Sequence, residues 1–507
     1  MESQENKTNL ITKFFTFGSL AIILAISIIF RFHQIDKLSF WNDEIFSFFA
    51  SKSSITQIAK LDPNMSFYHL LAYFWVKLFP SAKDGLLRLL PAIFSILSIP
   101  IVYLLGKNIK INRKKDTLVG LIAAGFVAIN AYHIQYAQEF RGYSLLFLLS
   151  TLSSLFLLKA VKFNKRSPNS PNPFWFWYAL ISIAAIYTHF FAVFTLAAQA
   201  LSLFILRQKN QKDFPMQEVL FSFAFISLFT IPVVNSALTR GASQISWITK
   251  PTLDSVLRFA VRITGNQGIP LLGVFSFTSL VGFLSILKAK ISRNPIKLFE
   301  LTLLVNCLLL PIILSIAISL LLTPIFLDRY LIFIMPYFTV LSALGLIQIT
   351  KLGGKKLISK IITLLTSFAI FASIIYLSIT GTLSYFKNFQ KEDWRSASQF
   401  LENNCLGSDN LRLYYMIYTE RDATYYAPNV NSQITNWSKV VNKNPSVEDI
   451  QKAIDNKPYS KACLIVSHVS GPYVPTLKNI DSALTQKFPK VKTTDFSQIQ
   501  VKIYENQ

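Results

Sequence analysis

Long apolar stretches, each near the length of a bilayer crossing, recur along most of this chain. A helix needs about 20 apolar residues to span a membrane. In lipid, the backbone N–H and C=O groups of such a stretch must bond to one another, which favours helices. The sequence therefore predicts a polytopic α-helical membrane protein with about eleven transmembrane helices, at 14–32, 86–106, 117–132, 142–160, 174–188, 190–206, 217–236, 269–287, 298–322, 330–350 and 357–380.

Composition places the chain in the same class. Of its 507 residues, 52% are hydrophobic, 44 are Phe and only 15% are charged, which is too apolar for a soluble domain of this length. The formal net charge of +24 would suggest a nucleic-acid-binding protein only if the cations gathered on one soluble face. Most of them instead fall in short loops between the apolar stretches.

These loop cations alternate along the chain. The loop from Lys107 to Asp116 is basic, and every second loop after it repeats the bias, near 159–166, 207–212, 288–297 and 351–360. Cations are retained on the cytoplasmic side, so the alternation predicts a cytoplasmic N-terminus and places everything after residue 381 outside the cytoplasm. No small-residue cleavage motif follows the first span, and we expect an uncleaved signal anchor.

Two shorter apolar segments lie between the first and second spans. Apolar residues recur at helical spacing over 45–61, which predicts one interfacial helix that ends at Asp62-Pro63. The aromatic-rich stretch 67–79 is too short to cross and predicts a second interfacial or re-entrant helix. Further on, the Pro/Ser/Asn-rich stretch 167–173 predicts a cytoplasmic linker.

After residue 381 the composition becomes that of a soluble domain. Periodicity predicts helices at 392–403, 446–456 and 475–487 and strands at 411–418, 462–467 and 499–504. We therefore expect a transmembrane module over 1–380 and a small extracytoplasmic α/β domain over 381–507. Cys307 lies in an apolar stretch, so only Cys405 and Cys463 could pair in a soluble region, and their pairing stays open.

Two adjacent carboxylates, Asp43 and Glu44, directly follow the first span. Acids beside a bilayer are costly to desolvate, and a polytopic protein that places them there usually uses them. The alternative is that Asp43 caps the short helix that follows. From these residues alone, both interpretations stand.

The loops predicted on the outer face contain no Gly-rich phosphate loop, and nucleotides are scarce outside the cytoplasm. An activated group would then arrive on a lipid. Sugar transfer from a polyprenyl phosphate needs a base for the acceptor hydroxyl and cations for the departing phosphate. Asp43 suits the first task, and single Arg residues suit the second.

Several short motifs occur in an order that resembles the GT-C glycosyltransferases of the protein O-mannosyltransferase and aminoarabinose transferase type. They cover the chain, at Phe40 to Glu44, Phe67 to Leu71 with Trp75, Leu87 to Pro91, Gln138 to Tyr143, Thr188 to Phe190, Asp328 to Tyr330 and Asp393 to Arg395. The resemblance implies inverting sugar transfer from a polyprenyl-phosphate donor to a hydroxyl of a lipid, glycan or protein acceptor. It also implies a bacterial plasma (inner) membrane.

The resemblance assigns roles to the acid pair and to the second outer loop. It makes Asp43 the base or the residue that positions the acceptor. We expect Glu44 to orient backbone or acceptor groups, and a solvated acid is the alternative. Glu139 and Arg141 would flank the reaction site, although a local ion pair is the alternative. One departure from the family is the stretch that begins Asp62-Pro63, which leaves the donor sugar open.

Other polar residues on the same face are candidates for holding the donor phosphate. Arg329 with Tyr330 suits a bidentate grip. His189 suits a donor to phosphate or an interfacial anchor equally well. Arg258 and Arg262, one helical turn apart, suit either the phosphate or lipid headgroups. Because no close cluster has metal-ligand spacing, we assign no metal residue, and dependence on a divalent metal stays open.

Two other functions fit a polytopic chain. A transporter or lipid flippase tends to bury ionisable groups near the membrane midplane and to show repeat-related broken helices, whereas this chain keeps its acids at span ends and shows no repeat. A non-catalytic assembly protein would bind through its C-terminal domain. In that case Asp43 and Glu44 would be replaceable without loss.

Overall fold

The computed structural model describes residues 2–109, 116–166, 171–245, 247–288, 295–354, 356–416, 418–430, 446–455, 458–469 and 474–506. The predicted linker at 167–173 and the basic loop after Lys107 lie largely outside these residues. Chain contacts divide the protein into two units. Unit 1 comprises Met1–Ile35, Ala50–Ser81 and Leu86–Asn388, and unit 2 comprises Asp36–Phe49, Ala82–Gly85 and Phe389–Gln507.

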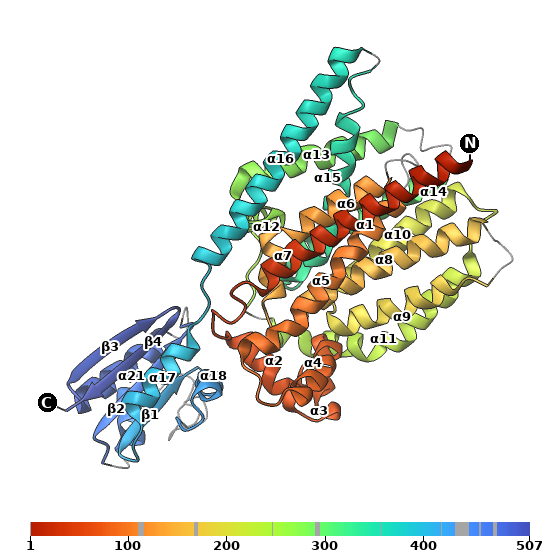
Figure 1. Ribbon diagram of the computed structural model, residues 1–507. Coiled ribbons are helices and arrows are strands. Elements are labelled where there is room, and N and C mark those ends of the chain that lie inside the picture. Colours follow the sequence, from red (N-terminus) through yellow and green to blue (C-terminus); the bar gives the residue numbers. More distant parts are fainter. Residues whose placement is uncertain are drawn as a thin grey trace. The chain divides into compact units, whose positions relative to one another are not determined.

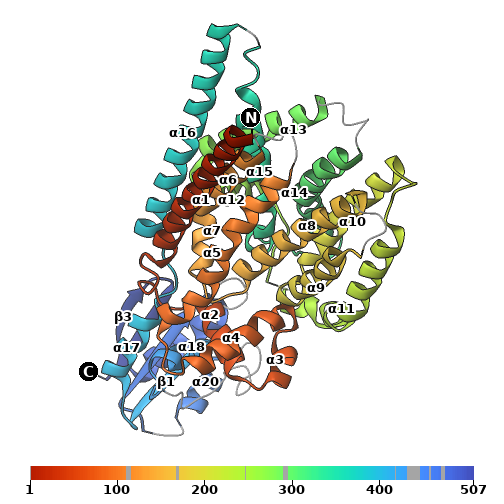
Figure 2. The same cartoon turned by 45° about the vertical axis from the view of Figure 1, so that its right-hand side comes forward.

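Helices build unit 1 (Figures 1 and 2), and each predicted span coincides with a helix. These helices are α1 (Glu2–Phe32), α5 (Asp84–Asn108), α6 (Asp116–Ala128), α8 (Tyr143–Arg166), α9 (Pro173–Thr188), α10 (Ala192–Lys209), α11 (Met216–Gln244), α13 (Gly268–Lys288), α14 (Pro295–Leu321), α15 (Met335–Ile349) with the preceding 3-10 helix η3 (Asp328–Ile334), and α16 (Leu357–Asn388).

Fewer of these helices are full-length spans than the eleven expected. Within the described residues, eight are long and apolar enough to cross a membrane, or nine if one bent pair counts as a span. The helix α9 is apolar but has only 16 residues. The expectation of a polytopic helical membrane protein is confirmed.

The predicted single span at 117–132 is wrong in detail. The helix α6 ends at Ala128, and a separate helix α7 (Ala131–Ala137) follows at an angle of 63°. The guanidinium of Arg31, which is fully buried, donates from Nη1 to the Ala128 carbonyl at 2.9 Å and from Nη2 to the Val127 carbonyl at 3.4 Å. Carbonyls at a helix end lack partners inside the helix, so Arg31 stabilises the break.

The segment after α1 also contains a break that the periodicity did not predict. The structure has α2 (Asn42–Lys52) and α3 (Ile55–Leu61) where one helix over 45–61 was expected. The side chain of Gln57 accepts from the Ser54 N–H at 3.2 Å, which begins a new helix there. Asp62 ends α3 as predicted, and η1 (Pro63–Met65) and α4 (Ser66–Leu78) follow.

Close helix packing in unit 1 depends on small residues. The helix α13 packs against α15, and a Cβ placed on Gly345 would lie 1.8 Å from the Thr278 carbonyl oxygen. The hydroxyls of Thr278 and Ser342 share a hydrogen bond of 2.6 Å across this contact. Small residues and interhelical hydrogen bonds hold helices together where lipid supplies no hydrophobic drive.

Unit 2 contains the expected α/β domain. Its four strands are β1 (Asn410–Tyr415), β2 (Lys461–Ser467), β3 (Lys490–Phe496) and β4 (Ile499–Glu505), in the order β1-β2-β4-β3, with β1 parallel to β2 and the other pairs antiparallel. Its helices are α17 (Trp394–Cys405), α18 (Thr419–Tyr426), α20 (Val447–Ile454) and α21 (Val474–Lys487). Sequence periodicity did not predict β3 and α18.

The core of this domain lies between the sheet and its helices. Leu411, Leu464 and Ile480 are each fully buried in it. A disulfide joins Cys405, at the end of α17, to Cys463 in β2. The pairing that the sequence left open is therefore present, and Cys307 is free and buried in α14.

Candidate functional site

The loop that follows α7 holds two of the predicted site residues in unit 1. Glu139 is 3% exposed and Arg141 is 8% exposed. The Arg141 N–H donates to the Glu139 carbonyl at 2.6 Å, and the Gln135 amide donates to Glu139 Oε1 at 3.4 Å. The guanidinium of Arg141 lies 5.9 Å from the ring centre of Tyr143. This loop thus presents an acid and a cation beside an aromatic ring.

His189 and Tyr330 meet in the same unit. Their ring centres are 4.6 Å apart, and Phe191 lies 5.0 Å from Tyr330. The ring centre of Tyr143 is 6.0 Å from that of His189. His189 Nδ1 accepts from the Phe191 N–H at 3.3 Å, and His189 Nε2 lies 3.5 Å from the side-chain amide nitrogen of Asn64. Residues from three separate predicted motifs therefore share one aromatic cluster.

Arginine side chains surround these rings. The guanidinium of Arg329 lies 5.8 Å from the ring centre of Tyr330 and 5.5 Å from that of Trp247. The charges of Arg141 and Arg329 both act on the imidazole of His189. We call Glu139, Arg141, Tyr143, His189, Arg262, Asp328, Arg329 and Tyr330 the arginine–tyrosine cluster.

Arg262 belongs to this cluster through an ion pair. It lies on α12 (Leu253–Thr264), and its side chain pairs with Asp328 at the start of η3. The three guanidinium groups of the cluster face two carboxylates, so the cluster carries net positive charge. Such a site suits an anion, and a phosphate in particular.

The structure does not bring Arg258 into the cluster. Its side chain is 68% exposed and pairs with Asp254, one turn earlier on α12. An exposed pair of this kind contributes little to stability or to a buried site. We therefore leave Arg258 out of the candidate site.

The aromatic residues of α4 pack inside unit 1. Tyr68 and His69 are fully buried, and Gly142 approaches so closely that a Cβ there would lie 3.1 Å from the Tyr68 Cβ. Burial, and then the charge of Arg141, lower the pKa of His69 to about 3, so that the imidazole is neutral. These contacts pack Tyr68 and His69 into the interior of unit 1.

The acid pair lies in unit 2, in the first turn of α2. Negative charge is favourable at the start of a helix, where backbone N–H groups point outward. Glu44 is fully buried, and its Oε2 accepts from Lys391 Nζ at 3.0 Å and from the Trp41 N–H at 3.5 Å. Asp43 is only partly buried. The two acids are therefore distinct, with Glu44 held in an ion pair and Asp43 more accessible.

Asn42, which precedes the acid pair, is held at three points within unit 2. Its amide donates to Asp422 Oδ2 at 2.8 Å, and its N–H donates to Glu392 Oε2 at 3.2 Å. Its carbonyl accepts from Arg421 at 3.2 Å. Burial raises the pKa of Asp422 to about 7, although Arg421 and Asn42 oppose the shift. These bonds fix the backbone that carries Asp43.

A histidine also faces this network. His468 Nε2 and Glu392 Oε1 lie 2.5 Å apart, and Trp394 Nε1 donates to the other oxygen of Glu392 at 2.5 Å. The hydrogen bond to Glu392 raises the pKa of His468 despite its partial burial, and the negative charges of Glu392, Asp422 and Asp43 raise it further. The acids of this network therefore favour the protonated form of His468.

Sequence reasoning did not find Lys391, Glu392, Asp422 or His468. The partners of Lys391, Glu392 and Asp422 lie in α2, 347 to 380 residues earlier, and His468 joins them through Glu392. The one sequence feature that could have pointed to the site was that Lys391 and Glu392 directly precede the Asp393 to Arg395 motif. Spacing along a chain does not reveal pairs so far apart.

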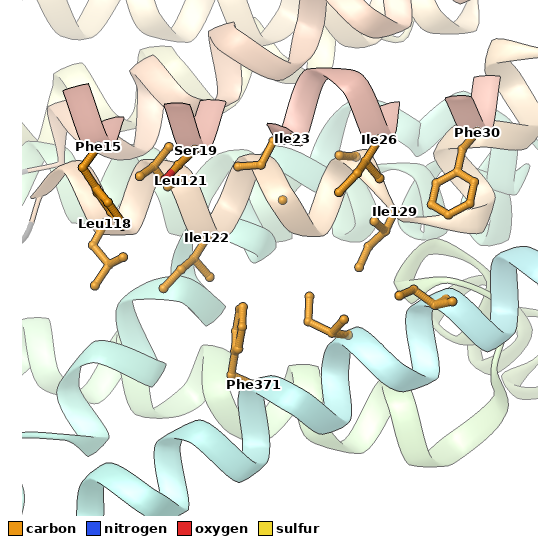
Figure 3. A pocket seen from close by; sticks show the side chains of 14 residues that line it. Phe15, Ser19, Ile23, Ile26, Phe30, Leu118, Leu121, Ile122, Ile129 and Phe371 are labelled. Atoms are coloured by element: carbon orange, nitrogen blue, oxygen red, sulfur yellow. The ribbon is translucent and has the colours of Figure 1, made fainter. Parts of the chain in front are cut away.

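An apolar groove runs along the helices of unit 1. It has a volume of about 430 Å³ and lies between α1, α6 and α16. Figure 3 shows Phe15, Ile23 and Phe30 in a row on α1, opposite Phe371 of α16. From Phe15 to Phe30 this row extends about 22 Å at the helical rise of about 1.5 Å per residue. The groove has the shape of a slot for an extended hydrocarbon chain.

Among the described residues, no group of three or more His, Cys, Asp and Glu side chains is placed to hold a metal ion. Two carboxylates of the candidate site, Asp328 and Glu44, are paired instead with Arg262 and Lys391. No residue is therefore assigned to a metal.

Solved structures share the fold of this chain. The oligosaccharyltransferase of Archaeoglobus fulgidus, in its apo form, matches with a TM-score of 0.54 and 12% identity, over 89% of this chain and 70% of the other. ArnT from Cupriavidus metallidurans, both apo and bound to undecaprenyl phosphate, matches with a TM-score of 0.58 and 12% identity, over 96% of this chain and 98% of the other.

The likeness is one of structure rather than sequence. No protein-family model and no curated protein sequence matches the chain. The solved structures above are GT-C glycosyltransferases, so the chain has the GT-C fold that its motif order resembles.

Proposed function

We propose that this integral membrane protein is a glycosyltransferase that moves a sugar from a polyprenyl-phosphate carrier to a hydroxyl of a lipid, glycan or protein acceptor. The observation that carries the proposal is the GT-C fold, which ArnT bound to undecaprenyl phosphate shares over nearly its whole length. The arginine–tyrosine cluster and the apolar groove of unit 1 supply features that such a donor requires.

The proposed reaction is the inverting transfer that the motif resemblance implies. Asp43 takes the proton of the acceptor hydroxyl, and the hydroxyl oxygen attacks the anomeric carbon from the side opposite the phosphate, which inverts the configuration. The bond between that carbon and the phosphate oxygen breaks, and polyprenyl phosphate leaves with the bonding electrons. Cations that meet this developing charge lower the barrier. Arg141 and Arg329 suit that role, with His189 and Tyr330 beside them.

The two acids have separate tasks in this proposal. Glu44 is fully buried and bonded to Lys391, which suits a residue that fixes the first turn of α2 rather than one that exchanges protons. Asp43 is more accessible and follows the anchored Asn42. General-base assistance contributes roughly 100-fold to 10,000-fold in rate.

The donor chain has a candidate place in the apolar groove between α1, α6 and α16. The groove is lined by Ile, Leu and Phe side chains, so it suits the branched hydrocarbon of an isoprenoid. Burial of such a chain contributes about 25 cal/mol for each Å² removed from water.

The test is sugar transfer by the protein in lipid nanodiscs. Polyprenyl phosphates that carry labelled hexoses or pentoses are supplied with candidate acceptors, and free polyprenyl phosphate and labelled product are measured. We expect Asp43→Asn to lose at least about 100-fold in rate. The matched control Asp254→Asn, an exposed acid on α12, should keep its activity.

Two results would contradict the proposal. If no lipid-linked sugar is consumed, the protein is not this kind of transferase, and movement of intact labelled lipid across liposomes would indicate a flippase. If Asp43→Asn turns over at the rate of the wild type while it remains folded, Asp43 is not the base.

We also propose that unit 2 lies outside the cytoplasm of a bacterial plasma membrane and that the N-terminus lies inside. The alternating basic loops support this orientation. A reporter fused within the loop before Asp393 should be active only in the extracytoplasmic compartment. Cytoplasmic activity would place the acid pair on the wrong side for a lipid-linked donor.

A further inference from the structure

A polar cavity lies wholly within unit 2. It has a volume of about 410 Å³ and is lined by Asp36, Lys83, Asp84, Arg395, Tyr425 and Tyr426. This volume falls within the range of small-molecule sites, about 300–1,000 Å³. The proposed transfer reaction uses none of these residues.

The cavity has a rigid wall built around one buried carboxylate. Asp84 is 4% exposed, and it accepts from Arg395 Nη2 at 2.7 Å, from the Tyr425 hydroxyl at 3.0 Å and from the Tyr426 hydroxyl. A buried carboxylate is retained only when such partners compensate its desolvation. The wall is therefore fixed before any ligand arrives.

The ring of Tyr425 is also held in place. It stacks on Phe40 with ring centres 5.7 Å apart, and Phe48 and Tyr426 meet it edge-on at 4.9 Å and 4.7 Å. Rigid aromatic side chains bind with little loss of conformational entropy. Such a ring offers an apolar surface inside an otherwise polar cavity.

The charges of the lining balance. Asp36 and Asp84 supply two negative charges, and Lys83 and Arg395 supply two positive charges. A site for phosphate or for an acidic peptide would carry excess positive charge. A balanced set of acceptors and donors beside an aromatic ring instead suits a ligand with many hydroxyls and no net charge.

The geometry points to a binding site for an uncharged saccharide unit, and we propose that this unit belongs to the acceptor. The inference rests on the proposed function, because it makes the acceptor a glycan or a glycosylated molecule rather than a bare protein or lipid hydroxyl. The exposed side chains of Lys83 and Asp36 bond to the sugar hydroxyls, and the wall around Asp84 sets the shape of the site.

Saturation-transfer NMR on the full-length protein tests the binding. The protein is placed in lipid nanodiscs, since the sugar headgroup of a maltoside detergent would compete. The probes are methyl α-mannoside, N-acetylglucosamine and glucose 6-phosphate. We expect transfer to the two neutral sugars and a decrease in affinity of at least roughly tenfold in the variant Lys83→Leu/Asp36→Asn, since hydrogen bonds to two charged groups are lost.

The substitutions are chosen to keep the fold. Both side chains lie on the surface, and Asn at position 36 retains the oxygen that accepts from the Gly85 N–H at 2.9 Å. The control is Lys492→Leu, an exposed lysine of β3. Absence of transfer to the neutral sugars, equal transfer in the variant, or a preference for glucose 6-phosphate would each overturn the inference.

A second measurement separates this inference from the proposed function. Donor turnover by the Lys83→Leu/Asp36→Asn variant should match the wild type at saturating acceptor, while the KM for a glycan acceptor rises at least roughly tenfold. If the wild type transfers sugar and the variant shows an unchanged KM, the saccharide site is refuted and the transferase stands. If neutral sugars bind but no donor is consumed, the proposed function fails alone.

Discussion

Replacing Lys391 by Met should loosen the start of α2. Glu44 is fully buried and accepts from Lys391 Nζ at 3.0 Å. Methionine keeps the length of the side chain and removes the ammonium that compensates the buried charge. Removal of one member of a buried ion pair costs roughly 3–5 kcal/mol. The cost falls on the first turn of α2, which carries Asp43.

Hydrogen exchange followed by mass spectrometry measures this cost on the full-length protein. A factor of ten in an equilibrium constant corresponds to about 1.4 kcal/mol, so amides at 42–49 should exchange roughly 100-fold to 4,000-fold faster in Lys391→Met. Amides of α13 in unit 1 should be unaffected. The double variant Glu44→Gln/Lys391→Met should regain most of the protection, because both charges are then absent.

Two results would contradict this prediction. Unchanged exchange at 42–49 in Lys391→Met would show that the ion pair does not hold this turn. Equal loss of protection in the single and double variants would show that the uncompensated charge of Glu44 is not the cause of the loss. Lys492→Met, on the exposed strand β3, serves as the control for a substitution of the same type.

Three further outcomes are expected. Arg329→Gln should raise the KM for a lipid-linked donor roughly 10-fold to 100-fold. Arg258→Gln, which alters an exposed residue outside the arginine–tyrosine cluster, should leave this KM unchanged. Equal effects of the two substitutions would show that Arg329 does not hold the phosphate. The carboxylate beside His468 raises the pKa of the imidazole above the usual 6.5. The contribution of His468 to stability is therefore present at lower pH and is lost as pH rises through that higher pKa. His468→Gln should flatten the decline of the unfolding temperature above pH 6.5, and an unchanged dependence of the unfolding temperature on pH would contradict the assignment. The double variant of Cys405 and Cys463 to Ser should lower the free energy of unfolding of unit 2 by about 4 kcal/mol, because the disulfide closes a loop with a sequence separation of 58 and so reduces the entropy of the unfolded chain. A loss below about 1 kcal/mol in chemical denaturation would mean that the unfolded state keeps residual structure without the disulfide.

The parts of the fold that depend on local pattern could be predicted from the sequence. Each apolar stretch is a helix, and the strands β1, β2 and β4 follow alternating or buried runs. The edge strand β3 was missed because its residues are mostly exposed and include two lysines and two threonines, which carry no burial signal. The break after Ala128 was missed because its stabilising group, Arg31, lies 97 residues earlier.

In the candidate site, too, residues marked by local pattern could be predicted from the sequence, whereas pairings between distant residues could not. Glu139 with Arg141, and Arg329 with Tyr330, stood out because single charges are rare in an apolar background. The different burial and pairing of Asp43 and Glu44 could not be predicted from two adjacent acids in the sequence. They depend on Lys391, which only the folded chain brings to Glu44.

The buried Arg31 also has a consequence for the order in which the helices assemble during synthesis. Its side chain bonds to carbonyls of Val127 and Ala128, which the ribosome adds about 97 residues later. At a synthesis rate of about 5–20 residues per second, α1 waits roughly 5–20 seconds for those carbonyls. During this delay the guanidinium must stay hydrated at the membrane surface, so α1 reaches its final depth only after α6 has been made.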